Sequence, residues 1–193
     1  PLLHNKKDKN RDNWWNKINK WKDKYPFEYH ESNDIKTPDI IKSINYNLDK
    51  EKKYIFTTGV GNHQMQTGQY IEWNENRKLI TSGSLGVMGV GIPYGIGAKL
   101  AEPNSGVIVI DGDSSSLMSI TDLKTIKEND IDIKILICDN SSQGMVEIWE
   151  RLFFENRITA TKNECNPDFV KLADAFGIKT FECTDKKKLD KTI

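Results

Sequence analysis

The segment from Gly106 to Met145 constrains the fold of this chain more than any other. A β-branched run from Val107 to Ile110 ends in polar residues, a helical segment follows, and a second apolar run occupies residues 135–138. A strand, a helix and a strand in succession form a crossover unit, which predicts two parallel strands. The carboxyl ends of parallel strands meet at one edge of a sheet, where open α/β sheets bind ligands.

Asp113 and Asn140 follow these two strands and are expected at that edge. A carboxylate oxygen and an amide oxygen suit an octahedral Mg²⁺ that is completed by water and phosphate oxygens. Asp and Asn also occur at strand ends simply as turn formers, so these two residues alone do not decide between a metal site and a turn. The sequence therefore predicts a Mg²⁺ site that holds a diphosphate, subject to what the flanking residues indicate.

Strands and helices alternate along the rest of the chain. Thr37–Pro38 and Asn166–Pro167 each predict a helix that begins with an N-cap residue followed by proline. This alternation predicts an α/β fold in which a parallel sheet is covered by helices on both faces. The predicted strands are 54–58, 79–82, 107–110, 135–138 and 179–183.

Composition excludes several functions. The 193 residues include 28 basic and 28 acidic side chains, so no global field favours nucleic acid or an acidic substrate. No apolar run approaches the roughly 20 residues of a membrane span, and no signal peptide is evident. The three cysteines lack metal-type spacing and are typical of reduced residues in an intracellular protein. We interpret the chain as a fragment of a longer protein.

The first part of the chain is polar, basic and rich in tryptophan. Trp14, Ile18, Trp21 and Tyr25 lie on one face of a helix that Pro26 ends. Such a helix could bind nucleic acid or a membrane surface, but we favour a connecting helix. We therefore expect an interdomain linker over 1–36 and a cofactor-binding domain over 37–193.

Two glycine-containing segments follow predicted strands. Gly59 to Met65 leaves the first strand and begins a helix, whose free N–H groups would attract phosphate. His63 would usually be a structural histidine, but its place at a third strand end favours a role at the site. The stretch 83–97 lacks the G-x-G-x-x-G pattern of a dinucleotide site, which argues against a Rossmann NAD site.

These segments resemble the C-terminal, diphosphate-binding domain of the acetolactate synthase (acetohydroxyacid synthase) catalytic subunits, a family of thiamine-diphosphate enzymes. The resemblance covers nearly the whole chain, and its details are most similar to the fungal members of the family. Three departures are mild: Ser114 and Asp139 replace a glycine and an asparagine of the family pattern, and Asn62 replaces a glutamine. The matching runs are 57–65, 82–89, 111–113, 143–146 with Trp149, and 166–169.

The resemblance implies a role for each matching residue. Asp113 and Asn140 would ligate Mg²⁺ through their side chains and Ser142 through its backbone carbonyl. Met88 would hold thiamine in its bent conformation, and Trp149 would shape the pocket for the second substrate, favouring 2-ketobutyrate. The other residues implied to bind the cofactor are Val60, Gly61, Asn62, His63, Gly86, Gly112, Ser114, Ser115, Gln143, Gly144, Met145 and Val146.

The resemblance also implies a carboligase. With thiamine diphosphate and Mg²⁺, such an enzyme removes CO₂ from pyruvate and joins the remaining two-carbon unit to pyruvate or 2-ketobutyrate. The product, 2-acetolactate or 2-aceto-2-hydroxybutyrate, belongs to the first common step of branched-chain amino-acid biosynthesis. In this family the cofactor-activating glutamate lies in the N-terminal domain of a neighbouring subunit and FAD binds the middle domain, so this fragment alone is expected to be inactive.

The resemblance further implies a homodimer or tetramer with sites at the subunit interface, a regulatory small subunit, and a mitochondrial location if the chain is fungal-like. Plastid and bacterial cytoplasm are the alternative locations. Two other functions stay open: another thiamine-diphosphate-dependent 2-keto acid decarboxylase or oxidase, and a non-catalytic module that binds the cofactor. Trp149 and the run 143–145 argue against the first, and retention of Asp113 and Asn140 argues against the second.

Overall fold

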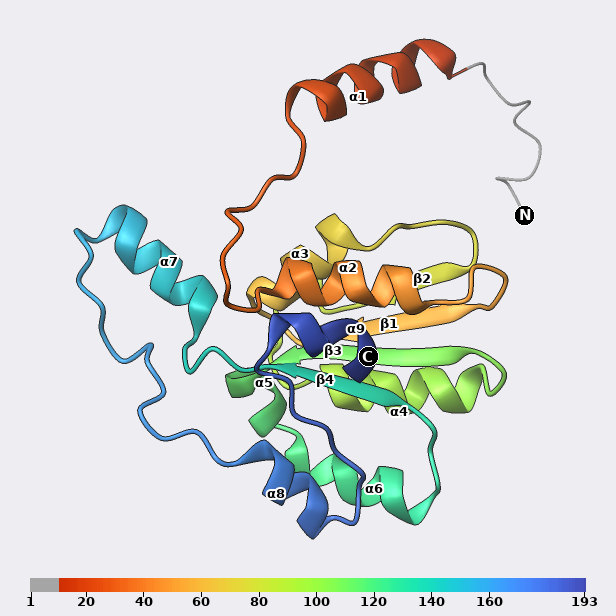
Figure 1. Cartoon of the computed structure of the whole chain (residues 1–193), viewed down its shortest axis with the longest axis vertical. Helices are drawn as coiled ribbons and strands as arrows, with labels where there is room; N and C mark the ends of the chain where they lie inside the picture. The colour runs from red at the N-terminus through yellow and green to blue at the C-terminus, as the bar shows by residue number, and fades with distance from the viewer. Residues whose placement is uncertain (1–10) are drawn as a thin grey trace. The chain divides into compact units, whose positions relative to one another are not determined.

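The computed structural model describes residues 11–193, and the chain divides after Glu31 into two compact units (Figure 1). In the first unit, α1 (Asp12–Lys24) is the helix predicted from the aromatic spacing. The rings of Trp14 and Trp21 meet edge to face on it, with centroids 5.8 Å apart. Residues 1–10 of the predicted linker lie outside the described residues, and the boundary predicted after residue 36 stays a prediction.

The second unit contains a four-stranded parallel sheet with the strand order β2-β1-β3-β4. Its register pairs Thr58 with Ile110 and Gly112 with Cys138, so the loops that leave β1, β3 and β4 emerge at one edge. This sheet confirms the predicted α/β class, and β2 spans 77–80 where the sequence predicted 79–82. The strands are β1 (Tyr54–Thr58), β2 (Arg77–Ile80), β3 (Gly106–Gly112) and β4 (Lys134–Cys138).

Helices connect and cover the strands. They are α2 (Thr37–Asn47), α3 (Asn62–Tyr70), α4 (Gly91–Ala101), α5 (Asp113–Leu117), α6 (Leu123–Glu128), α7 (Gly144–Phe153), α8 (Phe169–Ala175) and α9 (Leu189–Thr192), with short 3₁₀ turns at Ile120–Asp122 and Lys186–Lys188. Among the described residues, none of the helices combines the length and the apolar content needed to cross a membrane.

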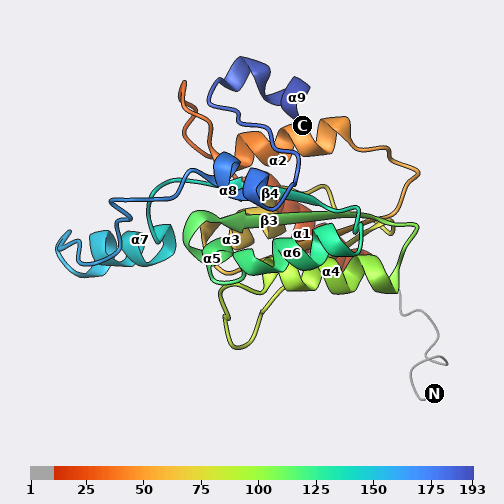
Figure 2. The ribbon, with the colours of Figure 1, turned by 90° about the horizontal axis from the view of Figure 1, so that it is seen from below.

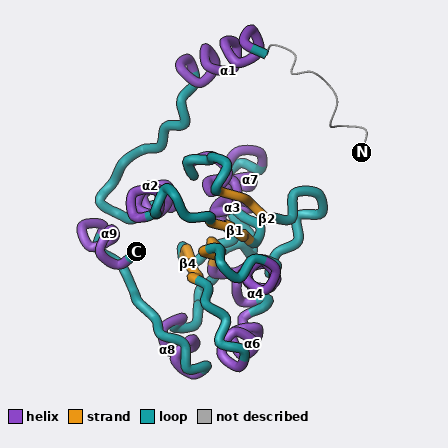
Figure 3. The backbone as a smooth tube through the Cα atoms, turned by 90° about the vertical axis from the view of Figure 1, so that its right-hand side faces the viewer, coloured by secondary structure: helices purple, strands orange, loops and turns teal. Residues whose placement is uncertain are grey.

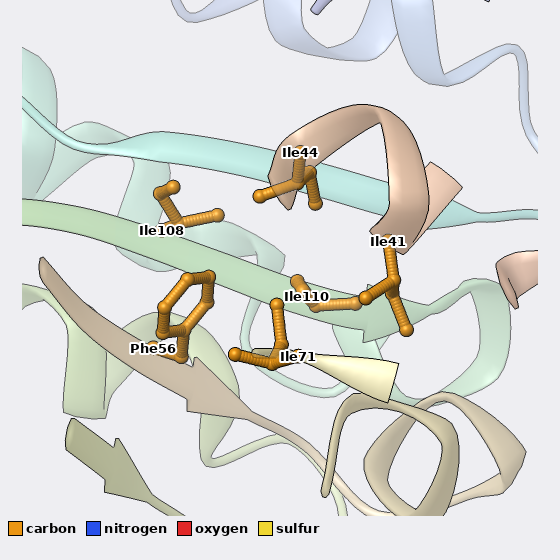
Figure 4. Close-up of a cluster of buried hydrophobic side chains, with 6 residues drawn as sticks. All are labelled: Ile41, Ile44, Phe56, Ile71, Ile108 and Ile110. Atoms are coloured by element: carbon orange, nitrogen blue, oxygen red, sulfur yellow. The ribbon is translucent and has the colours of Figure 1, made fainter. Parts of the chain in front are cut away.

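The side chains of β3 alternate between two hydrophobic clusters, as expected for a strand buried on both faces. Ile108 and Ile110 pack with Phe56 and with the α2 side chains Ile41 and Ile44 on one face (Figure 4). On the other face, β3 packs against α4, α6 and α8 through the cluster Ile92, Val109, Leu123, Ile126, Ile131 and Ala173. In Figure 2, α2 and α4 lie on opposite sides of β3, and the end-on view in Figure 3 shows the strands between helices.

The C-terminal segment packs against α2. Ser43 Oγ donates a hydrogen bond to Asp190 Oδ1 at 2.5 Å, and the Lys186 ammonium lies 2.8 Å from Asp39 Oδ1. Leu189 is buried beside them. The helix predicted after residue 186 is therefore confirmed, and these contacts hold it to the sheet through α2.

The strand predicted over 179–183 is wrong. These residues form no ladder with β4 or with any other described strand, and Phe181 is exposed. The segment has one large apolar side chain among polar neighbours, so it presents no apolar face that a sheet edge would bury.

The two predicted N-caps are also wrong, each by one or two residues. Lys36 is the N-cap of α2, and its backbone N–H donates to Asp39 Oδ2 at 3.0 Å. Asp168 is the N-cap of α8, and it accepts from the Lys171 N–H at 3.0 Å. Asn166 lies two residues before this cap, and its amide nitrogen donates to Asp113 and Asp139 at the edge of the sheet.

Candidate functional site

Three loops meet at the carboxyl edge of the sheet. They follow β1 (residues 59–63), β3 (112–115) and β4 (139–144), which are neighbouring strands. The topology that the sequence predicted therefore brings most of the predicted cofactor-binding residues to one edge. The fourth predicted segment, 82–89, follows the outer strand β2.

Gly144 lies between two of the predicted polar residues. A Cβ on Gly144 would stand 2.8 Å from Asn62 Nδ2 and 2.9 Å from Asn140 Nδ2, too close for either amide to stay in place. Asn62 begins α3, Asn140 follows β4 and Gly144 begins α7. Two loops, those after β1 and β4, thus converge here, and only a residue without a side chain lets them approach.

His63 is buried in the same region, at the start of α3. A Cβ on Gly112 would stand 2.9 Å from its Nδ1, so the ring lies close against the backbone that leads into Asp113. On its other nitrogen, Nε2 lies 3.2 Å from Asp111 Oδ1 without meeting hydrogen-bond geometry. The Asp111 carboxylate is fully buried and also accepts from the Gly112 N–H at 2.9 Å.

Asp113, the predicted metal ligand, is buried and accepts from two asparagines that the sequence analysis did not assign to the site. Asn163 Nδ2 lies 2.8 Å and Asn166 Nδ2 2.7 Å from Asp113 Oδ2. Both asparagines come from the loop between α7 and α8, about 50 residues further along the chain. No spacing rule links residues so far apart, so the sequence offered no signal for this contact.

The predicted ligand Ser142 lies in a short antiparallel pairing with the same loop. Ser142 and Lys162 form the bridge, through hydrogen bonds from Asn163 N to Ser141 O at 2.9 Å and from Gln143 N to Thr161 O at 2.7 Å. In such a pairing the bonds fall on the flanking residues, and the N–H and C=O of the central residue point away from the partner segment. The Ser142 carbonyl is therefore not used by this pairing, while its N–H lies 3.2 Å from Asn140 Oδ1.

The segment after β2 joins the site through Ser115. The Gly89 N–H donates to Ser115 Oγ at 3.0 Å, and Val87 N–H donates to Ser82 Oγ at 3.0 Å within the turn. A Cβ on Gly86 would stand 4.0 Å from the Val60 side chain, in ordinary contact. Met88 is half-buried in this turn, and its predicted role against thiamine stays a prediction.

The apolar residues of α7 lie outside this convergence. Val146 and Trp149 are 49% and 61% exposed, and Trp149 contacts the Phe153 ring edge to face at 6.2 Å. The start of the helix is attached to the site, because Ser142 Oγ donates to Glu147. That hydrogen bond is the main cause, and the hydrogen bond from the Arg151 guanidinium the second, of a lowered pKa of the Glu147 carboxyl, which therefore stays ionised. The structure therefore leaves both Val146 and Trp149 exposed on α7, and neither is buried with the residues around Gly144.

The donor set decides which ligand fits this edge. In residues 11–193, no group of three or more His, Cys, Asp or Glu side chains could hold a metal ion. One carboxylate, one amide oxygen and one carbonyl instead suit a Mg²⁺ that takes its remaining oxygens from a diphosphate and water. Buried Asn62 Oδ1 lacks a hydrogen-bond partner in the described structure, so a polar atom beside the metal ligands is left for a bound ligand.

Comparison with known proteins points to the same ligand. Residues 59–193 match the family described as "Thiamine pyrophosphate enzyme, C-terminal TPP binding domain". The matched range begins at the loop after β1 and includes the loops after β3 and β4. It therefore contains every residue of the predicted site.

Similar proteins share a common description. The chain is 39% identical to the mitochondrial acetolactate synthase catalytic subunit of Aspergillus candidus over 100% of this chain and 28% of that protein. It is 44% identical to the mitochondrial catalytic subunit of Saccharomyces cerevisiae, with 94% of this chain and 27% of that protein covered. It is 36% identical to the acetolactate synthase isozyme 2 large subunit of Escherichia coli, with 95% of this chain and 33% of that protein covered. The chain thus spans about a third or less of each relative.

Proposed function

Because the chain belongs to the thiamine pyrophosphate enzymes, as their C-terminal TPP-binding domain, we propose that it holds thiamine diphosphate through Mg²⁺ at the carboxyl edge of the sheet. Asp113 and Asn140 supply side-chain oxygens to the cation and Ser142 supplies its carbonyl. The observation that carries this proposal is the convergence of the loops after β1 and β4 on Gly144, where buried Asn62 Oδ1 has no hydrogen-bond partner among the described residues. Mg²⁺ and diphosphate oxygens would complete that set.

The remaining contacts of the proposed cofactor come from residues around the cation site. Val60, Gly61, Asn62 and His63 face the diphosphate at the start of α3, where free N–H groups favour an anion. Gly112, Ser114 and Ser115 bind the phosphates on the other side. Gly86, Met88 and the run Gln143, Gly144, Met145 and Val146 form the wall around the ring system.

The activity that we propose is that of acetolactate synthase, as the C-terminal part of a catalytic subunit. When bound, thiamine diphosphate supplies the nucleophilic carbon that allows a 2-keto acid to lose CO₂ and to be joined to a second one. The chain's own residues fix the position of the diphosphate, and Trp149 lies in the pocket of the second 2-keto acid, pyruvate or 2-ketobutyrate. The products are 2-acetolactate and 2-aceto-2-hydroxybutyrate.

Other features of the proposal depend on parts beyond these 193 residues. We propose that the glutamate that activates the cofactor and the FAD site belong to other domains of the enzyme, and that the active site forms between subunits of a homodimer or tetramer. A separate regulatory small subunit and a mitochondrial location are part of the same proposal. Relatives described as "large subunit" and fungal relatives described as mitochondrial support these two points.

Product analysis tests the proposed activity. The complete catalytic subunit that contains this chain is incubated with pyruvate, with and without thiamine diphosphate and Mg²⁺, beside an Asp113→Ala variant. We expect acetolactate that depends on both cofactors and disappears in the variant. Release of acetaldehyde alone would indicate a decarboxylase instead, and cofactor binding without any product would indicate a non-catalytic module.

A further inference from the structure

The carboxylate of Asp113 is held from one side only. In the described part of the chain, Asn163 Nδ2 and Asn166 Nδ2 both donate to its Oδ2, at 2.8 Å and 2.7 Å, and no hydrogen bond to its Oδ1 is found. A carboxylate oxygen has about two lone-pair positions, so two amide donors occupy Oδ2. Oδ1 is left as the oxygen that can accept a cation.

Both asparagine amides are fully used in this arrangement. Each amide nitrogen carries two hydrogens. Asn163 Nδ2 also lies 2.7 Å from Ser114 Oγ, and Asn166 Nδ2 lies 2.8 Å from Asp139 Oδ1. Asn166 therefore stands between two carboxylates and donates to both, which offsets the repulsion that would otherwise turn Asp113 away from Asp139.

The backbone attaches Asn163 to the other proposed ligand loop. Its N–H donates to Ser141 O at 2.9 Å, in the pairing that leaves the Ser142 carbonyl pointing away. A single residue thus binds the Asp113 loop through its side chain and the Ser142 loop through its backbone. The distance between two proposed ligands is set through Asn163.

We propose that Asn163 and Asn166 are positioning residues for the Mg²⁺ site, which fix the Asp113 carboxylate so that Oδ1 faces the cation. This inference rests on the proposed function, because it assumes that Asp113 ligates Mg²⁺. The two asparagines do not touch the cation. Residues that orient a metal ligand in this way usually alter metal affinity about 10- to 100-fold when they are removed.

Mg²⁺ titration of thiamine diphosphate binding tests the inference in the complete catalytic subunit. Wild type, Asn163→Ala, Asn166→Ala and Cys165→Ala are titrated with thiamine diphosphate at a series of Mg²⁺ concentrations, and binding is measured by calorimetry. Cys165 is an exposed residue between the two asparagines and serves as the matched control. We expect both asparagine variants to need about 10- to 100-fold more Mg²⁺ for half-maximal binding, and Cys165→Ala to behave as wild type.

Saturating Mg²⁺ separates positioning from a merely structural role. Because the asparagines act through the cation, the thiamine diphosphate affinity of both variants should return to that of wild type. Asn166→Gln, which keeps an amide donor, should need less Mg²⁺ than Asn166→Ala. An unchanged Mg²⁺ requirement in both alanine variants, or weak cofactor binding that saturating Mg²⁺ does not restore, would overturn the inference. Wild-type binding that needs no Mg²⁺ would instead overturn the proposed metal site itself.

Discussion

The imidazole of His63 lies against the carboxylate of Asp111, with Nε2 3.2 Å from Oδ1 and both side chains buried. The two residues come from different elements, the start of α3 and the end of β3. The contact places the other ring nitrogen over Gly112, next to the proposed metal ligand. A fully buried aspartate thus determines how His63 is presented at the edge of the sheet.

The first prediction concerns this aspartate. Asp111→Ala removes the acceptor of the buried Gly112 N–H, and we expect the free energy of unfolding to fall by about 1–3 kcal/mol. Asp111→Asn keeps an oxygen that can accept from the Gly112 N–H, so its free energy of unfolding should fall by less. Urea unfolding of both variants measures the difference. Equal losses in the two variants would show that the Gly112 hydrogen bond is not the cause.

Gly144 gives a prediction about cofactor binding. The Cβ of Gly144→Ala would displace the amide ends of Asn62 and Asn140, so we expect weaker thiamine diphosphate binding at every Mg²⁺ concentration. Gly97 in α4 provides the control, because a Cβ there meets nothing within 4 Å. Gly97→Ala should leave binding unchanged and stabilise the helix by about 0.5–1 kcal/mol. Calorimetric titration with the cofactor would contradict the site if Gly144→Ala bound as tightly as Gly97→Ala.

Cys138 makes stability depend on pH in the alkaline range. Burial raises the pKa of its thiol from 9.0 to about 11, with a smaller contribution in the same direction from Asp111 and Asp113 and an opposing one from the Thr37 hydroxyl. The folded state therefore keeps the proton where the unfolded state has lost it. The stabilisation is complete below pH 9 and is lost as the pH rises from 9 to 11, by up to about 2–3 kcal/mol.

Unfolding of wild type and Cys138→Ala at pH 8, 9, 10 and 11 measures that effect. The variant has no thiol at this position, so the difference in unfolding free energy between the two proteins should shrink across the window. A constant difference would mean that Cys138 does not titrate differently in the folded chain.

Substitution of Trp149 is expected to change the products and not the stability, whereas substitution of Trp73 is expected to lower the stability. Trp149 is 61% exposed, so Trp149→Ala should change the unfolding free energy by no more than about 0.5 kcal/mol. The Trp73 ring packs edge to face on Phe56, with ring centroids 5.7 Å apart, and its Nε1–H donates to Gly68 O. Trp73→Ala should therefore lower the free energy of unfolding by about 1–3 kcal/mol.

In the complete enzyme, Trp149→Ala should lower the ratio of 2-aceto-2-hydroxybutyrate to 2-acetolactate. An unchanged ratio in a competition assay would remove Trp149 from the proposed pocket.

Much of the sheet could be predicted from the sequence, because its inner strands are continuous apolar runs. The side chains from Val107 to Ile110 alternate between the two faces of the sheet and enter three buried clusters, and such a run has few alternatives to a central parallel strand. Parallel topology then places Asp113 and Asn140 at one edge without further information. The segment 179–183 lacked that signal, with a single exposed Phe181 among polar residues, and its predicted strand did not form.

The surroundings of Asp113 could not be predicted in the same way. Asn166 carries the features of a helix cap in the sequence, yet its amide bonds to Asp113 and Asp139 while Asp168 caps α8. The two carboxylates that accept from the Asn166 amide nitrogen lie 53 and 27 residues away in the sequence, so no local pattern reveals these contacts. Such contacts are set by tertiary packing and leave no periodic trace.

The central claim is that Asp113 binds the cation that holds thiamine diphosphate. Calorimetric titration of the complete subunit with thiamine diphosphate, with and without Mg²⁺, tests it most directly when Asp113→Ala is compared with Asp132→Ala, whose carboxylate forms an exposed ion pair with Lys134. We predict Mg²⁺-dependent binding in wild type and Asp132→Ala, and its loss in Asp113→Ala. Equal, Mg²⁺-dependent binding in all three proteins would contradict the claim.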